Sequence, residues 1–280
     1  MQQIISQWSM AGGGDGSLKP ADAIAQARAA GFAGVELAVG MTGPITPVTD
    51  QQSCEEIRVT IAKSGAVCET LASGLSWSFS PTHIDPAVRK KSLELHLGVI
   101  QRAAWMGMKA VLVVPGAVKI PWDSTYPPVP YDQATVWAKD FVKHLADSAG
   151  QVSVDVCVEN VWNGLFLSPI ELSQLIDDIG SPLVGIYFDV GNVLGSHQHP
   201  PHWIAMLGKR IKRIHIKDFK TSVGGLNGFC DLLAGDVPWK ETMAAIRAIG
   251  YDSTIVAEMM PPDETLLPRT KRAMDEIFAM

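Results

Sequence analysis

The chain has 280 residues, of which 47% are hydrophobic, so it is long and apolar enough to bury a substantial core. Its formal net charge is −6, its pI is near 5.6 and it has no long run of Lys or Arg, which argues against a groove for nucleic acid. It also lacks an apolar segment of membrane-spanning length and a basic-then-apolar N-terminal signal pattern, so we expect a soluble, cytoplasmic protein.

In the first half of the chain, short runs rich in β-branched residues alternate with longer stretches whose apolar residues recur about every 3.6 positions. The short runs predict buried strands and the longer stretches predict helices. The expected strands cover residues 3–8, 34–39, 66–71 and 110–114, and the expected helices cover residues 21–30, 51–63, 86–106 and 131–149. Glycines that end several helices, such as Gly31, Gly65 and Gly107, predict short turns into the following strand.

The same alternation continues through the second half. Further strands are expected at residues 154–159, 184–189, 211–215 and 255–258, and further helices at residues 168–179, 201–207, 238–249 and 263–278. Eight strands and eight helices in strict alternation predict an α/β protein built as a (β/α)8 TIM barrel, a fold that typically takes about 250 residues. No charged linker or low-complexity tract divides the chain, so we expect a single domain over residues 1–280.

The longer connections follow the strands, on the face that carries the chemistry in barrels of this kind. Trp122 lies in one of these connections, between residues 115 and 130. An aromatic side chain in that position is expected to wall a substrate pocket against water, and packing within the loop is the alternative.

Each of the last four predicted strands ends in an ionisable side chain: Glu159, Asp189, His215 and Glu258. The ends of parallel barrel strands converge on one face, where three carboxylates and an imidazole would repel and desolvate one another unless a cation held them. This donor set suits one hard or borderline divalent ion, with Mn²⁺ favoured and Mg²⁺, Co²⁺ or Zn²⁺ as alternatives. Taken singly, each residue could instead cap the next helix or be a satisfied core residue.

Short motifs accompany these four residues: VEN at 158–160, FDVGN at 188–192, HIKD at 215–218, AGDV at 234–237 and AE at 257–258. The ordered set resembles the xylose-isomerase-like barrel superfamily. Within it, the chain is most similar to the sugar-phosphate isomerases and epimerases, including ketose 3-epimerases and L-xylulose-5-phosphate 3-epimerase. The resemblance implies metal ligands at Glu159, Asp189, His215 and Glu258, with Glu159 and Glu258 also forming the acid/base pair.

The chain departs from the family pattern at two places. Many ketose epimerases carry a His three residues after the Asp of the sixth strand, where this chain has Asn192, an amide that can bind a substrate hydroxyl but cannot carry a proton. After the seventh strand the chain has Lys217 instead of an Arg, followed by Lys220. We predict that these lysines contact a substrate phosphate, because this sector of barrels often binds one, and a solvated loop is the alternative.

The implied activity is that of a metal-dependent isomerase or epimerase of a ketose or ketose phosphate, with proton transfer through an enediolate. One alternative is a metal-dependent dehydratase of an inosose or dehydroshikimate-type substrate, and another is a non-catalytic sugar-binding barrel. The abasic-site endonuclease branch is disfavoured, because it uses a His-rich cluster and Asn192 replaces one expected ligand. The expected partner is a small sugar or sugar phosphate, with no nucleic acid or membrane, and the sequence is compatible with a homo-oligomer.

Overall fold

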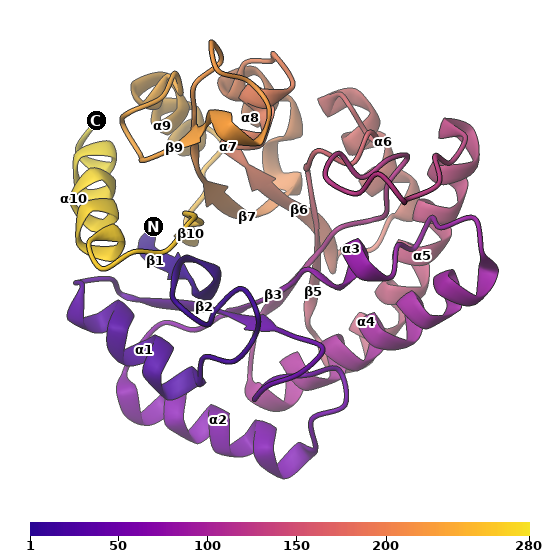
Figure 1. Ribbon diagram of the computed structural model, residues 1–280, viewed down its shortest axis with the longest axis horizontal. Coiled ribbons are helices and arrows are strands. Elements are labelled where there is room, and N and C mark those ends of the chain that lie inside the picture. The colour runs from indigo at the N-terminus through magenta and orange to yellow at the C-terminus, as the bar shows by residue number, and fades with distance from the viewer.

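Eight parallel strands close into a barrel in the computed structural model, which describes residues 1–280 (Figure 1). The first and last strands of the chain pair with each other, and the order around the ring is β1-β10-β7-β6-β5-β4-β3-β2. The predicted (β/α)8 TIM barrel is therefore confirmed. The barrel strands are β1 (Gln2–Ser6), β2 (Gly34–Val39), β3 (Thr70–Ser73), β4 (Ala110–Val113), β5 (Asp155–Glu159), β6 (Val184–Asp189), β7 (Ile211–Ile216) and β10 (Thr254–Ala257).

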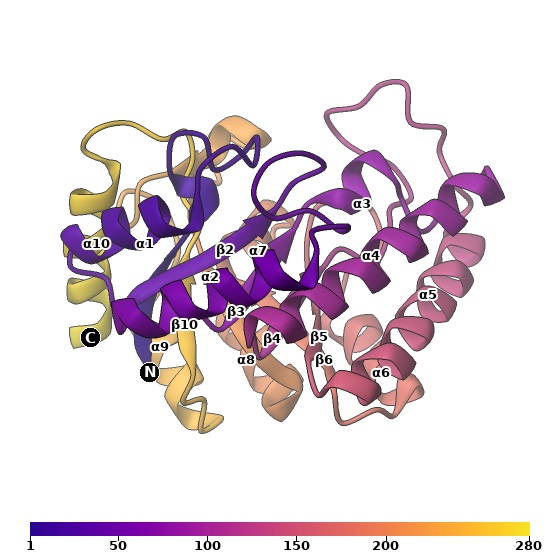
Figure 2. The same ribbon diagram turned by 90° about the horizontal axis from the view of Figure 1, so that it is seen from below.

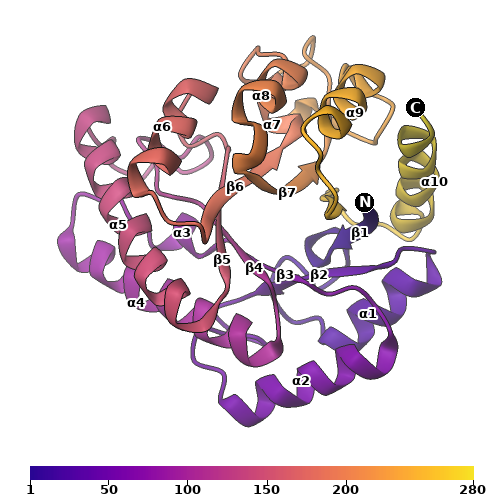
Figure 3. The same cartoon turned by 180° about the vertical axis from the view of Figure 1, so that it is seen from behind.

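Helices form an outer ring around the strands (Figure 3). Several of them have Pro in the first turn, where a missing N–H leaves no hydrogen bond unmade. None of them has both the length and the apolar composition that crossing a membrane requires. The main helices are α1 (Pro20–Ala29), α2 (Gln51–Ser64), α4 (Pro86–Met106), α5 (Tyr131–Val152), α6 (Pro169–Ile179), α8 (Pro200–Leu207), α9 (Trp239–Ala248) and α10 (Leu266–Ala279).

Two strands, β1 and β3, differ from the prediction by more than one residue at an end. The first strand ends at Ser6 and not at residue 8, because the Ser6 side chain accepts a hydrogen bond from Trp8 N–H and starts a short 3-10 helix. The third strand begins at Thr70, since Val67 makes only an isolated bridge with Gly34. Sequence periodicity fixes the centre of a strand better than its ends, where side chains compete for the backbone.

Two short helices and one pair of short strands lie in connections that were expected to be loops. Helix α3 (Leu75–Ser78) follows β3, and helix α7 (Val190–Gly195) follows β6 directly. The connection after β7 contains an antiparallel pair, β8 (Asp218–Phe219) with β9 (Phe229–Cys230). The Asp218 carboxylate fixes this connection in place. It accepts hydrogen bonds from the N–H groups of Phe219, Leu233 and Val237 and from the Trp239 indole at the start of α9, the last at 3.0 Å.

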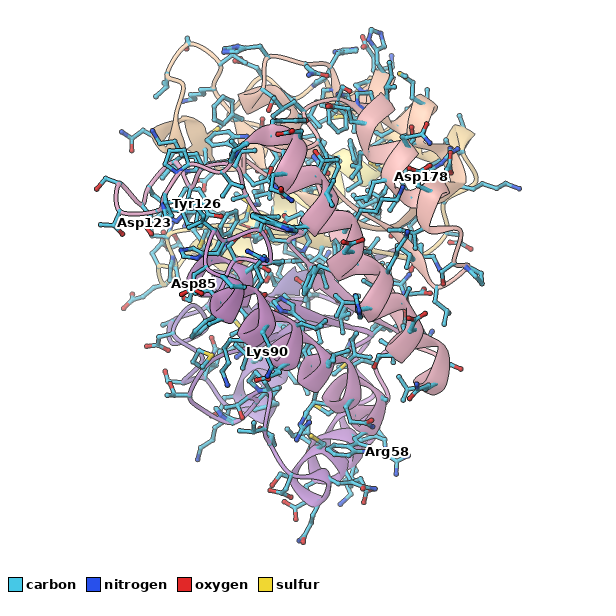
Figure 4. All side chains as sticks on the ribbon, turned by 90° about the vertical axis from the view of Figure 1, so that its right-hand side faces the viewer. Arg58, Asp85, Lys90, Asp123, Tyr126 and Asp178 are labelled. Atoms are coloured by element: carbon cyan, nitrogen blue, oxygen red, sulfur yellow. The ribbon has the colours of Figure 1, made fainter.

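Long connections gather on the side of the barrel opposite both termini (Figure 2). In Figure 4, Asp85, at the start of α4, lies toward the left of the view with Asp123 and Tyr126, and Arg58 and Asp178 lie toward the right. The Tyr126 hydroxyl lies 2.9 Å from Ser80 Oγ and 3.0 Å from the Ala117 carbonyl oxygen. These contacts join the connection after β4 to the connection after β3.

The apolar core has two parts. The larger part lies between the strands and the surrounding helices, and the smaller part fills the barrel interior with side chains such as Ile4, Leu112, Cys157, Tyr187 and Val256. The inner part is filled by buried hydrophobic side chains, so the ends of the strands above it are the place where polar groups can meet.

Candidate metal centre

The structure brings the four ionisable side chains at the strand ends together. Glu159 ends β5, Asp189 ends β6, His215 lies on β7, and Glu258 follows β10, so they come from four neighbouring strands (Figure 1). One potential ligand atom from each lies within 4.8 Å of the others. Although Glu258 lies one residue beyond β10, its N–H donates to the Ile216 carbonyl at 3.1 Å, which holds it in line with the strand. We call Glu159, Asp189, His215 and Glu258 the four-residue cluster.

Three atoms of the four-residue cluster are buried and make no hydrogen bond of good geometry: Asp189 Oδ2, His215 Nδ1 and Glu258 Oε2. Their near neighbours are charged groups of the same site, since His215 Nδ1 lies 2.9 Å from Glu258 Oε2 and both carboxylate oxygens lie within 3.1 Å of Lys217 Nζ. A buried polar atom without a partner costs about 1–3 kcal/mol, and more if the group is charged, so three of them converging on one place require an explanation. The three carboxylates and the imidazole form the mixed oxygen and nitrogen donor set that divalent ions prefer. The residues therefore fit a divalent metal ion.

Asp189 both caps a helix and faces the cluster. Its Oδ1 accepts a hydrogen bond from Asn192 N–H at 2.9 Å at the start of α7, which leaves Oδ2 directed at the other ligands. Asn160, the residue after Glu159, bonds with its amide to both the N–H and the carbonyl oxygen of Asp189 at 2.8 and 2.9 Å. The asparagines of the VEN and FDVGN motifs thus stabilise the ends of β5 and β6. Asp189 can cap the helix with one carboxylate oxygen and face a metal ion with the other, so the two interpretations of this residue are compatible.

His215 is oriented by Glu36, a residue of β2 that the sequence analysis missed. His215 Nε2 lies 2.8 Å from Glu36 Oε1, and the Tyr187 hydroxyl donates to the other oxygen of the same carboxylate. All three side chains are fully buried. Because a carboxylate only accepts, Nε2 carries the hydrogen, and in the neutral ring Nδ1 presents its lone pair to the cluster. Metal-binding histidines are commonly held by a carboxylate in this way.

Glu36→Gln is expected to weaken Mn²⁺ binding by about 10–100-fold, because the neutral amide no longer fixes the ring and its basicity. Titration calorimetry would measure the dissociation constant. Glu55→Gln, on the exposed face of α2, is the matched control and should bind as the wild type does. Equal affinity of the Glu36→Gln protein and the control would contradict this role for Glu36.

Lys217 places an ammonium group beside the four-residue cluster. Its Nζ lies 3.0 Å from Glu258 Oε2 and 3.1 Å from Asp189 Oδ2. Burial acts against its charge, but Asp189, Glu258 and Glu159 raise the pKa of Lys217 above its ordinary value. Burial also acts to raise the pKa of Glu258, but Lys217 and His215 outweigh it and lower that pKa to about 2.

The other groups of the cluster hold protons more tightly. Burial raises the pKa of Glu159 to about 7 and also raises the pKa of Asp189. Burial acts to lower the pKa of His215, but the Glu36 charge, with Glu159 and Glu258, raises it well above its ordinary value. The metal-free cluster therefore retains protons at neutral pH that a metal ion must displace.

We expect Mn²⁺ affinity to rise as the pH increases from 6 to 8. The raised pKa values of Glu159 and His215 mean that both groups hold protons at the lower pH, where protons compete with the metal ion for the ligand atoms. Because the proton concentration falls as the pH increases, the metal ion competes more successfully at the higher pH. Calorimetry in buffers of different ionisation enthalpy would count the released protons. An affinity that does not change over this range would contradict the expectation.

A cavity of about 480 Å³ opens above the cluster. Of the four cluster residues, Glu159 and Glu258 line it, whereas Asp189 and His215 are fully buried behind them. Asn192, Lys217 and Trp122, three of the four residues predicted to contact substrate, also line the cavity. Lys220, the fourth, is exposed and does not line it.

Comparisons with known proteins agree with this architecture. A family model described as "Xylose isomerase-like TIM barrel" matches residues 24–277. An uncharacterized protein of Methanocaldococcus jannaschii is 23% identical over 188 residues, which make up 64% of this chain and 60% of that protein.

Several solved structures share the fold. D-psicose 3-epimerase from Clostridium cellulolyticum H10, solved with D-tagatose, superposes with a TM-score of 0.83 at 18% identity, covering 99% of this chain and 98% of that one. 3-Keto-D-glucoside 4-epimerase from E. coli gives 0.78 at 14% identity, covering 100% of both chains. An L-ribulose 3-epimerase gives 0.79 at 17% identity, covering 99% of this chain and 94% of that one. By the extent of the family match, this chain belongs to the xylose isomerase-like TIM barrel family.

Proposed function

We propose that this protein is a metal-dependent epimerase or isomerase that moves a proton on the carbon beside the carbonyl group of a ketose-type sugar. The observation that carries the proposal is the four-residue cluster at the floor of a cavity, where three carboxylates and an imidazole bring one ligand atom each within 4.8 Å of the others. The solved structures with the same fold are named as epimerases of keto sugars, which supports the same class of reaction.

The two glutamates are proposed to carry the proton. Glu159 and Glu258 are the members of the cluster that line the cavity, and they are separated in the ring by β6 and β7. A substrate between them would present one face to each carboxylate, so that one removes the proton and the other returns a proton with inverted configuration. Asp189 and His215, which are enclosed, have the role of ligands only.

The divalent ion that these residues fit would supply Lewis-acid stabilisation of the negative charge that develops on the sugar oxygens. Glu159, Asp189, His215 and Glu258 would hold it. Asn192 lines the cavity beside Glu159, and its amide offers a hydrogen bond to a sugar hydroxyl. The apolar walls keep bulk water from the reacting carbon.

Exchange of hydrogen with solvent tests the proposal. The protein with Mn²⁺ would be incubated in D₂O with D-fructose, D-psicose, D-tagatose and L-ribulose, and the products followed by NMR. We expect deuterium at C3 together with the C3 epimer, or deuterium at C2 of an aldose product if the protein is an isomerase. Loss of water with an enone or diketone product would indicate a dehydratase instead. The absence of deuterium in all of these sugars would contradict the proposal.

A further inference from the structure

The cavity above the four-residue cluster is polar at its floor and apolar at its mouth. Eleven of its seventeen lining residues are hydrophobic, and five of them are aromatic. The polar lining residues Glu159, Glu258 and Asn192 are buried, with at most 7% of their surface exposed. Trp122, Leu226 and Met260 line the same cavity and are 46%, 51% and 60% exposed. We call Trp122, Leu226 and Met260 the apolar rim.

The rim has a fixed aromatic platform. Trp122 packs edge-on against Trp77, with ring centroids 4.7 Å apart. Its connection is held by Tyr126, whose hydroxyl contacts Ser80 and Ala117. A large apolar surface that is kept exposed at the mouth of a cavity is typical of a binding groove, and a platform that is already ordered loses little freedom when a ligand binds.

The rim offers no charge for a phosphate. Lys217 is the one basic lining residue, and two carboxylates of the cluster hold it. Arg269, which lies close to the rim connections, is bound by Asp231 at 2.9 Å and Asp263 at 2.7 Å. The site holds four buried carboxylates, three in the cluster and that of Glu36, and one ammonium group, that of Lys217. Adding the two positive charges of a divalent ion therefore leaves no surplus positive charge. A phosphate dianion would enter this site without a partner.

We propose that the apolar rim is a subsite for an aromatic or aliphatic group, and that the substrate is an uncharged keto sugar that carries such a group at the end remote from its carbonyl. The inference rests on the proposed function for the position of the sugar over the cluster. On this assignment the reacting carbons lie at the floor, and the same cavity of about 480 Å³ continues to the three rim side chains. This assignment replaces the phosphate contact that the sequence predicted for Lys217 and Lys220.

The test compares three ligands that share one reacting end: D-fructose, D-fructose 6-phosphate and 6-O-benzyl-D-fructose. Their dissociation constants would be measured with the Mn²⁺-loaded protein by calorimetry. We expect the benzyl sugar to bind about tenfold more tightly than D-fructose, as one well-packed aromatic contact provides, and the phosphate to bind no more tightly than D-fructose. Tighter binding of the phosphate, or a benzyl sugar that binds no better than D-fructose, would overturn the inference.

Substitutions at Trp122 test whether the apolar rim causes the preference for the benzyl sugar. Trp122→Ala should remove most of the preference for the benzyl sugar over D-fructose, and Trp122→Phe should restore much of that preference. Trp137→Ala is the matched control, because Trp137 packs against Arg89 on the outside of the barrel and does not line the cavity. A benzyl preference that survives Trp122→Ala would overturn the inference.

Binding and turnover separate the inference from the proposed function. A benzyl preference that depends on Trp122, in a protein that incorporates no deuterium from D₂O, would support the subsite and contradict the epimerase. Deuterium incorporation into D-fructose without any benzyl preference would support the epimerase and overturn the subsite.

Discussion

Glu159→Gln and Glu258→Gln are each expected to slow deuterium exchange at the reacting carbon by on the order of 10²–10⁴-fold, the usual contribution of a general acid or base. The amide keeps an oxygen that can face a metal ion but cannot carry a proton at neutral pH. Both residues line the cavity, so each can contact a bound sugar. The rate would be followed by NMR in D₂O, with Mn²⁺ at a concentration that saturates each variant.

Metal binding must be measured on the same samples, because a variant that lost its ion would also lose its activity. We expect both variants to retain Mn²⁺ with reduced affinity. Glu264→Gln is the matched control, since Glu264 is exposed in the connection after β10 and should leave the rate unchanged. Wild-type exchange in either the Glu159→Gln or the Glu258→Gln protein would refute the assignment of the pair as acid and base.

The Asp189→Ala, His215→Ala double variant is expected to lose stabilisation by Mn²⁺. A ligand at 100 times its dissociation constant stabilises the folded state by about 2.7 kcal/mol, which raises the Tm of a chain of this size by several degrees. The variant removes two of the four proposed ligands, and with them two of the three buried cluster atoms that make no hydrogen bond of good geometry. Thermal unfolding with and without Mn²⁺ would show a shift in the wild type and none in the variant.

Asp189→Asn provides a milder companion to the double variant. Its amide oxygen can still accept the hydrogen bond from Asn192 N–H, so the start of α7 is preserved while the ligand charge is lost. Asp147→Ala, at an exposed position of α5, is the control and should keep the full Mn²⁺ shift. A double variant that Mn²⁺ stabilises as strongly as it does the wild type would exclude the assigned ligands.

The barrel was predictable because its strands are short, buried and regularly spaced. Runs such as VGIYFD, at residues 184–189, are short and rich in β-branched and aromatic residues, which favours a buried strand, and the polar residue that ends each run marks the face that carries the four-residue cluster. The positions of Glu159, Asp189, His215 and Glu258 in one cluster follow directly from the parallel arrangement of their strands.

Glu36 shows what the sequence pattern did not reveal. It lies within the run GVELAV, which was interpreted only as a buried strand. A charged residue in the middle of such a run is itself a signal, because it must find a buried partner. That partner, His215, is 179 residues away along the chain, and only the closed barrel brings β2 within reach of β7.

The sequence pattern also did not predict the structure of the connections. Lys217 and Lys220 are three residues apart and were predicted to act together, but the β8–β9 pair separates them, so that Lys217 lines the cavity and Lys220 is exposed. The connection around that pair is held by hydrogen bonds to Asp218 from the N–H groups of Leu233 and Val237, 15 and 19 residues along the chain, which no local periodicity encodes.

The most direct test is a crystal structure of the protein grown with Mn²⁺, with anomalous scattering used to locate the ion. The account predicts a single strong anomalous peak at bonding distance from Glu159, Asp189, Glu258 and the Nδ1 atom of His215, with His215 Nε2 still bound to Glu36. A fully Mn²⁺-saturated protein whose peak lies elsewhere, with Lys217 still paired to Asp189 and Glu258, would contradict it.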